Sequence, residues 1–337
     1  MHTADESSHT ARLDRTQGGA ADPAPVAQAL REVRAALEVI LRGKERALEL
    51  ALACLIARGH LLLEDVPGTG KTTLARALAG AFGLRFARVQ FTSDLLPSDV
   101  LGGIVPDGVG GLLHRPGPVF TEVLLADELN RTPPRTQSAL LEAMAEGRVT
   151  IEGEAKALPE PFFVVATQNP AAFEGTYPLP ESQLDRFLAR LRLGYPPPES
   201  ERALLRARRT LQRPPEVQSF GRAPLLAGID AVRHVHVDPR IEDDLLAIIS
   251  MTRTSRAFAL GASPRAALDL DRFARALAVL DGRDYCVPDD IRRAAVPVLA
   301  HRLVAAEPAY HEHNTNDPIE RLLEAELETL PLPDRVG

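Results

Sequence analysis

The sequence is poor in cysteine: Cys54 and Cys286 are the only two among 337 residues, and they lie far apart along the chain. No CxxC pair and no cluster of histidine with cysteine accompanies them, so nothing in the pattern indicates a zinc site. Cys54 lies in an apolar run with helical character. We therefore interpret it as a reduced, buried thiol rather than as half of a disulfide or a metal ligand.

Long apolar runs and an excess of positive charge are also missing. The most apolar stretch, Leu48 to Ala57, contains Glu49 and is too short to span a bilayer. The N-terminus is polar and has no signal-peptide core, so we expect a soluble, cytoplasmic protein with no membrane segment. A net charge of −7 weighs against a general nucleic-acid or anionic-membrane surface, although not against a local basic patch.

Lysine is also scarce, because only three of the 39 basic residues are lysines. One of them, Lys71, lies in the stretch 64–73, which reads Glu-Asp-Val-Pro-Gly-Thr-Gly-Lys-Thr-Thr and follows the apolar run 60–63. A buried strand, a glycine-rich turn and a helix start form the layout of a phosphate-binding loop. Since arginine serves as the cation almost everywhere else, we expect Lys71 to be needed for its compact point charge.

The residue types in this loop match the chemistry of a bound nucleotide. Gly68 and Gly70 permit backbone angles that a side chain would block. Lys71 can reach the β- and γ-phosphates, and the Thr72 hydroxyl can hold Mg²⁺. The strict motif has glycine where this chain has Asp65, so an ordinary glycine turn remains the alternative. The nucleotide-binding residues that we predict here are Asp65, Val66, Pro67, Gly68, Thr69, Gly70, Lys71, Thr72 and Thr73.

Two acids follow another buried strand. The apolar run 123–126 leads directly into Asp127 and Glu128, and open α/β sheets bind ligands at the carboxyl ends of their strands. We predict that Asp127 holds Mg²⁺ through its water shell, and that Glu128 orients and polarises the attacking water. A solvated turn is the alternative interpretation of such a pair.

Two further polar side chains are candidates for contacts with a nucleotide. Asn169 follows the buried strand 162–167, and its amide can hydrogen-bond the attacking water or the γ-phosphate; a simple Asn-Pro turn is the alternative. Arg265 lies in the first turn of a predicted helix, where a cation opposes the helix dipole. Its simplest partner is an ATP phosphate held by the neighbouring domain, and an exposed arginine is the alternative.

Predicted strands alternate with helices along the first part of the chain. They cover residues 60–65, 86–91, 122–126, 162–167 and 188–193. This order predicts an α/β fold with a doubly wound, parallel, five-stranded sheet. An extra strand lies between the phosphate-loop strand and the acid-bearing strand, and a glutamate stands beside the Mg²⁺ acid. Both features favour an ATPase over a kinase or a GTPase, and no Asn-Lys-x-Asp guanine-reading sequence is present.

We divide the chain into a disordered tail at 1–23, an ATPase core at 24–212 and an all-helical lid domain at 213–337. Within the core, glycine and proline are dense at 94–121, which predicts a projecting hairpin or, alternatively, a flexible surface loop. The stretch 148–158 predicts a second hairpin.

Several helix ends carry explicit signals. Gly59 is expected to end the helix that begins near Glu45. Thr132 is a plausible N-cap, with Pro133 as the first helical residue. In the lid, we expect each helix to begin with a capping residue followed by proline.

Taken together, these segments resemble a MoxR-type AAA+ ATPase over about residues 36 to 325. The matching segments are Leu63-Glu64-Asp65-Val66-Pro67-Gly68 with Gly70-Lys71-Thr72, Asp94-Leu95-Leu96-Pro97-Ser98-Asp99, Gly117-Pro118-Val119-Phe120, Leu125-Ala126-Asp127-Glu128-Leu129-Asn130-Arg131, residues 136–144, Ala166-Thr167-Gln168-Asn169-Pro170, Leu184-Asp185-Arg186-Phe187 and Gly261-Ala262-Ser263-Pro264-Arg265. Asp65, which departs from the strict loop motif, is usual in this family.

The resemblance also implies a role for each candidate residue. It implies that Lys71 and Thr72 belong to the Walker A motif and that Asp127 and Glu128 form the Walker B motif. It likewise implies that Asn169 is sensor 1 and Arg265 is sensor 2. Arg186 is similar to the arginine finger that a ring subunit offers to its neighbour, and Arg131 is a second candidate. The segment 41–44, which includes Gly43, would contact adenine, although family members tend to have Val-Gly-Gln there.

Family members are thought to form hexameric rings and to act as chaperones on partners that often carry a von Willebrand factor A domain. Our lead hypothesis is therefore an ATP- and Mg²⁺-dependent enzyme that remodels or activates a partner protein. The alternatives are a nucleic-acid motor, a metal-chelatase motor subunit and a nucleotide-gated scaffold. The acidic composition weighs against the nucleic-acid motor, and the presence of Glu128 and Arg186 weighs against the scaffold.

Overall fold

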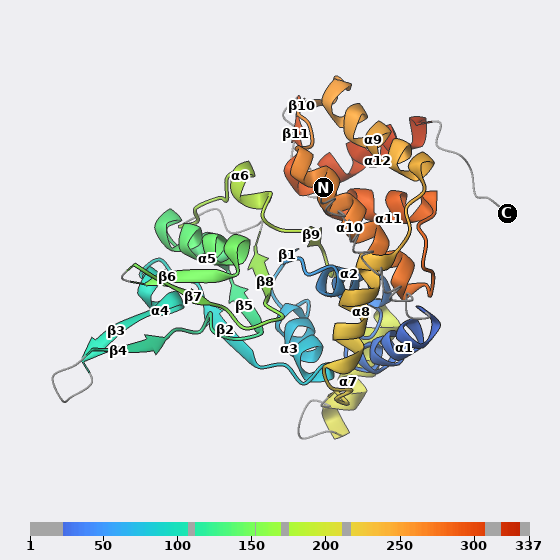
Figure 1. Ribbon diagram of the computed structural model, residues 1–337. Coiled ribbons are helices and arrows are strands. Elements are labelled where there is room, and N and C mark those ends of the chain that lie inside the picture. The colour runs from blue at the N-terminus through green and yellow to red at the C-terminus, as the bar shows by residue number, and fades with distance from the viewer. Residues whose placement is uncertain are drawn as a thin grey trace, which may run out of the picture.

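The structure of the protein is a computed structural model that describes residues 23–106, 112–151, 153–169, 175–210, 217–306 and 318–330 (Figure 1). The disordered tail predicted at 1–23 lies outside these residues except for Pro23, and so does the centre of the glycine-rich insert. Among the described helices, none combines the length and the apolar character that crossing a bilayer requires.

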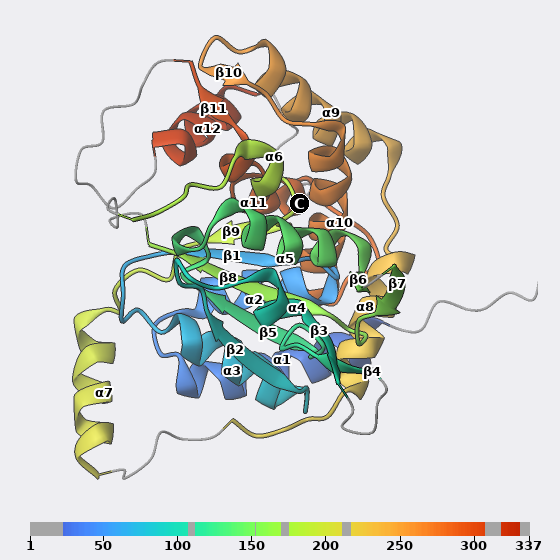
Figure 2. The same cartoon turned by 90° about the vertical axis from the view of Figure 1, so that its left-hand side faces the viewer.

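Five parallel strands form the central sheet, which confirms the predicted fold class. In sheet order they are β2 (Phe86–Gln90), β5 (Val123–Asp127), β8 (Phe163–Gln168), β1 (Leu61–Glu64) and β9 (Ala189–Leu191). Strand β8 lies between β1 and β5, as Figure 2 shows. Because all five run in the same direction, the loops that follow β1, β5 and β8 meet at one edge of the sheet.

Alternate residues of the central strands fill two separate apolar cores, because successive side chains of a strand point to opposite faces. Leu61, Leu63 and Leu125 belong to one core, and Leu62 and Leu124 belong to the other. The first core is covered by helices α1 (Pro23–Ile40), α2 (Glu45–Ile56) and α3 (Lys71–Ala81). The second is covered by α5 (Pro134–Glu146). This near-complete burial on both faces is typical of a parallel sheet.

Two antiparallel hairpins extend the core, and both were predicted from the sequence. The first follows helix α4 (Pro97–Leu101) and consists of β3 (Gly102–Pro106) and β4 (Leu112–Pro116). Figure 1 shows that it projects away from the rest of the molecule. The second consists of β6 (Arg148–Ile151) and β7 (Glu154–Ala157), directly after α5.

The C-terminal part of the chain is the helical lid that the sequence predicted. It follows α6 (Glu181–Leu184) and α7 (Pro198–Thr210) and contains α8 (Ala223–His234), α9 (Pro239–Thr254), α10 (Pro264–Leu280), α11 (Pro288–Leu299) and α12 (Pro318–Thr329), with the 3₁₀ turn η2 (Ala300–Arg302). Its helices share the first apolar core with α1 and α2. The predicted boundary at 212/213 falls outside the described residues and stays a prediction.

Two details correct the expectation of an all-helical lid with uniform capping. Strands β10 (Phe258–Leu260) and β11 (Val304–Ala305) form a small antiparallel sheet between lid helices. Before α11 the cap residue is Val287, which has no polar side chain. Asp290 compensates, because its Oδ2 accepts a hydrogen bond from the Val287 N–H at 2.9 Å.

The start of α5 corrects the prediction that Thr132 caps this helix. The helix begins at Pro134, one residue later than expected, and Pro133 is its N-cap with a ψ of 150°. Proline disfavours the helical conformation in the residue that precedes it, so Pro134 forces Pro133 to remain extended. Thr132 is fully buried, and its backbone carbonyl accepts a hydrogen bond from the Gln137 amide instead.

The end of α2 corrects the predicted role of Gly59. Arg58, not Gly59, takes the left-handed conformation, with a φ of +55°, and the N–H of Gly59 bonds to the carbonyl of Cys54 at 2.9 Å. Gly59 is nevertheless required, for a packing reason. A Cβ added there would lie 2.1 Å from Cδ2 of Leu188, which follows α6 and leads into β9.

We predict that Gly59→Ala destabilises the fold by about 1–3 kcal/mol, the usual cost of forcing an extra carbon into a packed core. Gly103→Ala is the matched control, because a Cβ at Gly103 meets no atom within 4 Å. Thermal unfolding followed by circular dichroism would compare the two variants. Equal melting temperatures for both would contradict the packing role of Gly59.

Candidate functional site

The loop between β1 and α3 has the geometry of an anion-binding turn. Gly68 and Gly70 adopt φ angles of +87° and +103°, in the left-handed region that glycine adopts without strain. Gly70 is the N-cap of α3, and Lys71 is the first residue of that helix. The positive end of the helix dipole therefore lies at the loop, where an anion is favoured.

Asp65 explains why this loop departs from the strict motif. Its Oδ1 accepts a hydrogen bond from the Val66 N–H at 2.9 Å, and its Oδ2 accepts one from the Gly194 N–H at 2.6 Å. The carboxylate thus ties the start of the loop to the chain beyond β9, which a glycine could not do. Thr69 likewise bonds within the loop, because its hydroxyl donates to the Val66 carbonyl at 3.3 Å.

Lys71 points its ammonium into the loop. Its Nζ donates to the carbonyl oxygens of Asp65 at 2.5 Å and Val66 at 3.1 Å. Burial lowers the pKa of Lys71, while the nearby carboxylates of Asp65, Asp127 and Glu128 oppose that shift. A phosphate entering the loop would add negative charge at the ammonium and so favour its charged form further.

Thr167 joins the two acids that follow β5, and the sequence analysis did not single it out. Its hydroxyl donates to Oδ1 of Asp127 at 2.7 Å and accepts from the backbone N–H of Glu128 at 2.8 Å. Glu128 has a φ of +57°, which is unusual for a residue other than glycine. One hydroxyl on β8 therefore supports the geometry of both acids.

Two side chains on β2 hold the same acids from the other side, and these were also missed. Arg88 donates from Nη2 to Oδ2 of Asp127 at 2.6 Å, and Gln90 donates from Nε2 to Oε2 of Glu128 at 2.8 Å. Both lie on one face of the strand, because they are two residues apart. Alternating polar residues near the end of the predicted strand 86–91 were the available signal.

These groups converge on a cavity of about 390 Å³. It is lined by Pro67, Gly68, Gly70, Lys71, Thr72, Thr73, Arg88, Gln90, Asp127, Glu128, Thr167, Gln168 and Asn169. The structure thus brings together most of the predicted loop residues, both acids and Asn169. Asp65, Val66 and Thr69 support the loop without lining the cavity.

The donors in this cavity suit a magnesium ion that is held partly by a nucleotide. Thr72 and Asp127 offer a hydroxyl and a carboxylate, the oxygen ligands that Mg²⁺ prefers. No group of three or more His, Cys, Asp or Glu residues that could hold a metal occurs in the part of the chain that the structure describes. A magnesium ion bound through one or two protein oxygens plus phosphates fits this set better than a dedicated protein cage.

The three predicted arginines lie outside the cavity lining. Arg131 lies in the turn η1 (Leu129–Arg131), and its Nε is 3.2 Å from Oε2 of Glu128. Arg186 donates from Nη1 to the carbonyl of Leu141 on α5 at 2.7 Å. Arg265 lies in the first turn of α10, as the sequence predicted, and its side chain is exposed; its contact with a phosphate stays a prediction.

The residue before Arg186 is anchored to the lid. Asp185 has its Oδ1 3.1 Å from Nη1 of Arg302, and the Ser263 hydroxyl donates to it at 3.3 Å. Arg302 is almost completely buried and also pairs with Asp269 of α10 at 2.7 Å. The segment that carries Arg186 is therefore attached to the same helix end that carries Arg265.

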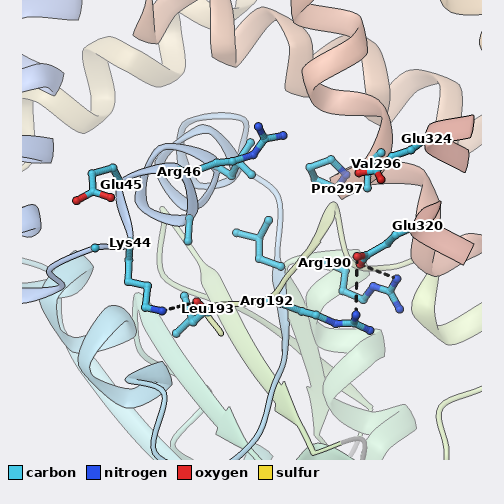
Figure 3. Close-up of a pocket in the computed structure, with 14 residues that line it drawn as sticks. Lys44, Glu45, Arg46, Arg190, Arg192, Leu193, Val296, Pro297, Glu320 and Glu324 are labelled. Atoms are coloured by element: carbon cyan, nitrogen blue, oxygen red, sulfur yellow. Dashed lines mark hydrogen bonds and ion pairs between the residues drawn. The ribbon is translucent and has the colours of Figure 1, made fainter. Parts of the chain in front are cut away.

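Gly43 lines a second cavity of about 460 Å³, between the start of α2, strand β9 and the lid (Figure 3). Lys44 donates from Nζ to the carbonyls of Leu193 at 2.6 Å and Gly194 at 2.8 Å, and burial lowers its pKa. Arg190 bridges Oε2 of Glu64 at 3.0 Å and Oε1 of Glu320 on α12 at 3.1 Å. Lys44 stands where family members tend to have Gln, and its ammonium holds Leu193 and Gly194, which lie just beyond the end of β9.

Comparison with known families divides the chain into two matched segments. Residues 60–189 match the family model described as the ATPase family associated with various cellular activities (AAA). Residues 250–322 match the model of the AAA lid domain. The first segment contains the loop, both acids and Asn169, and the second contains Arg265.

Three known proteins are similar to the chain over most of its length. The YeaC protein of Bacillus subtilis is 46% identical, in an alignment that covers 79% of this chain and 83% of YeaC. The protein named Chaperone MoxR1 of Mycobacterium tuberculosis is 38% identical over 96% of this chain and 87% of its own length. A crystal structure assigned as an ATPase, from Cytophaga hutchinsonii, superposes with a TM-score of 0.82 at 34% identity and covers 93% of this chain and 97% of that one.

From the positions of Lys71 and Glu128 in the cavity we predict that their loss has different effects on nucleotide binding and hydrolysis. Lys71→Ala should lose nucleotide affinity, because the phosphates lose their cation. Glu128→Gln should keep ATP binding but lose roughly 10²–10⁴-fold in hydrolysis, the range for a positioned acid–base group. Affinity for ATP and turnover would be measured on both variants. Normal hydrolysis by Glu128→Gln would remove Glu128 from the mechanism.

Proposed function

Because this chain belongs to the MoxR family of AAA+ ATPases and is an ATP-hydrolysing P-loop enzyme, we propose that it couples ATP binding and hydrolysis to the remodelling or activation of a partner protein. The observation that carries the proposal is one polypeptide that combines the nucleotide cavity with a projecting hairpin. We place this activity in the cytoplasm, and the partner that we propose carries a von Willebrand factor A domain, as the family resemblance implies.

In the nucleotide cavity, each side chain has a distinct task in this proposal. Lys71 and the N–H groups at the start of α3 bind the phosphates. Thr72 and Asp127 hold Mg²⁺, which neutralises charge on the phosphates when it is bound. Glu128 orients the attacking water and accepts its proton, and Asn169 hydrogen-bonds the water or the γ-phosphate.

The β3–β4 hairpin is the proposed contact for the partner. Ile104 and Leu113 are exposed on it, at 41% and 59% of their full area, and Leu96 just before α4 is exposed at 60%. Ile104 and Leu113 lie on opposite faces of the hairpin, because Leu113 is paired with Val105. A projection with exposed apolar side chains on both faces suits a partner that encloses it. The hairpin is also covalently connected to β2 and β5, the two strands that hold the acid pair. A partner on the hairpin would therefore act on strands that flank the nucleotide.

The assembly that we propose is a ring of identical subunits, with six members as the family resemblance implies. Arg186 supports it, because this cation lines no part of the chain's own nucleotide cavity and bonds to a backbone carbonyl of α5. In a ring it would reach the γ-phosphate of the next subunit. Arg131 is a weaker candidate for that role, since Glu128 of the same chain already pairs with it. Arg265 would contact the phosphates from the lid.

The alternative functions differ in simple measurements. A nucleic-acid motor would show ATPase activity stimulated by DNA, and a nucleotide-gated scaffold would bind ATP with little turnover. A metal-chelatase motor would act on a metal-inserting partner. The net charge of −7 continues to weigh against the nucleic-acid motor.

Substitutions on the hairpin should uncouple the partner from ATP hydrolysis. We predict that Ile104→Ser with Leu113→Ser weakens partner binding by about tenfold or more, as the loss of an apolar anchor does, and leaves basal ATPase activity unchanged. Shortening the insert between Gly103 and Leu113 should have the same effect. A partner captured on the Glu128→Gln variant would serve as the binding probe. Leu246→Ser, at an exposed lid position, is the control, and equal losses from both surfaces would exclude a specific role for the hairpin.

The trans role of Arg186 can be tested with two inactive variants. Arg186→Ala should bind ATP nearly normally but lose about 10³–10⁵ in turnover, the usual contribution of an arginine finger. Lys71→Ala has a defective loop and an intact Arg186. Mixing both at concentrations that permit subunit exchange should restore part of the activity, because some interfaces then pair a working loop with a working arginine. Mixed oligomers with no activity at any ratio, or a monomer that hydrolyses ATP at full rate, would contradict the shared site.

A further inference from the structure

Arg88 lines the nucleotide cavity, and none of the roles predicted above involves its side chain. It lies on the edge strand β2, beside β5, and its side chain is 46% exposed, whereas that of Asp127 is only 11% exposed. Both Nη2, at 2.6 Å, and Nε, at 3.1 Å, donate to the same oxygen, Oδ2 of Asp127. This is a charge-assisted contact between a planar donor and one carboxylate oxygen.

The other oxygen of Asp127 is already engaged. Its Oδ1 accepts the hydroxyl proton of Thr167 at 2.7 Å, and that hydroxyl is held in turn by the backbone N–H of Glu128. A divalent cation or its water shell that uses Asp127 therefore meets a carboxylate that already accepts from Thr167 at one oxygen and twice from Arg88 at the other. Two cations so close to one carboxylate repel each other, and the partly buried position screens them less than bulk water does.

We propose that Arg88 is the resident counter-cation of Asp127 and that Mg²⁺ entering with ATP exchanges with it. In the nucleotide-free protein the guanidinium neutralises the carboxylate. When the metal binds, the guanidinium leaves Oδ2 and swings towards solvent, which its exposure permits. Arg88 is thus a positioning residue that sets the Mg²⁺ concentration at which the site fills. The inference rests on the nucleotide site of the proposed function and is independent of the partner protein and of the ring.

The exchange also affects the neighbouring acid. Nη2 of Arg88 donates to Oε1 of Gln90 at 3.3 Å, and Gln90 donates to Glu128 at 2.8 Å. The two β2 side chains therefore support each other while each holds one acid. When the guanidinium swings towards solvent it also leaves Oε1 of Gln90, which removes one of the contacts that orient Gln90. Metal entry at Asp127 is in this way sensed at Glu128.

The test titrates Mg²⁺ against binding of a fluorescent, non-hydrolysable ATP analogue and repeats the binding in EDTA. Arg88→Met keeps the length of the side chain and removes its charge. The half-saturating Mg²⁺ concentration should fall by about tenfold, as expected when a charge-assisted hydrogen bond no longer competes. Affinity in EDTA should not improve, because the cavity has lost a positive charge. Arg88→Lys, which keeps a charge without the planar fork, should give an intermediate Mg²⁺ requirement.

Arg85→Met is the matched control. Arg85 immediately precedes β2 and pairs with Glu122, at the opposite end of the strands from the acids, so its loss should leave the Mg²⁺ requirement unchanged. Adding Asp127→Asn to Arg88→Met should abolish the gain. An Arg88→Met protein with an unchanged or raised Mg²⁺ requirement overturns the role of Arg88 alone. Wild-type binding that ignores Mg²⁺ overturns this role together with the proposed metal site.

Discussion

The parallel pairing of β8 between β1 and β5 is the constraint on which the nucleotide cavity depends. Glu64 lies opposite Gln168, and Ala126 lies opposite Ala166, so the loop, the acids and Asn169 emerge at the same level. The same pairing lets Thr167 reach Asp127 and lets the N–H of Asp65 bond to Gln168. A slip of one residue would turn each apolar side chain to the wrong core and separate these groups.

The lid is bound to this sheet by two different kinds of interaction. Its helices share an apolar core with α1 and α2. Apolar contacts are non-directional, so this packing tolerates small rotations. Glu320 pairs with Arg190 and Arg192 near the carboxyl ends of β1 and β9. Asp185 pairs with Arg302 at the opposite edge of the sheet, ahead of β9. Through Arg190 the Glu320 contacts reach Glu64, the last residue of β1 before the phosphate-binding loop. Ion pairs therefore tie the lid to both edges of the sheet.

Local patterns in the sequence were sufficient to predict the five strands, both hairpins, the glycine-rich loop and the acid pair. Their signals lie within a few residues of one another. The contacts of Arg88, Gln90 and Thr167 with the two acids could not be predicted, because they depend on which strands are neighbours in the sheet. The carboxylate of Asp65 finds its second partner at Gly194, far along the chain. Gly59 was misread for the same reason, since the atom it avoids belongs to Leu188.

The buried guanidinium of Arg302 has a mechanical consequence. Its side chain is only 2% exposed and pairs with both Asp185 and Asp269, and removing one partner of such a buried charge costs roughly 3–5 kcal/mol. Thermal motion of the lid is therefore accommodated far more easily by rotation about the ion pairs of Arg302 than by breaking them. Because Arg186 directly follows the anchored Asp185, a rotation of the lid would carry the backbone of Arg186 with it and change where its guanidinium points.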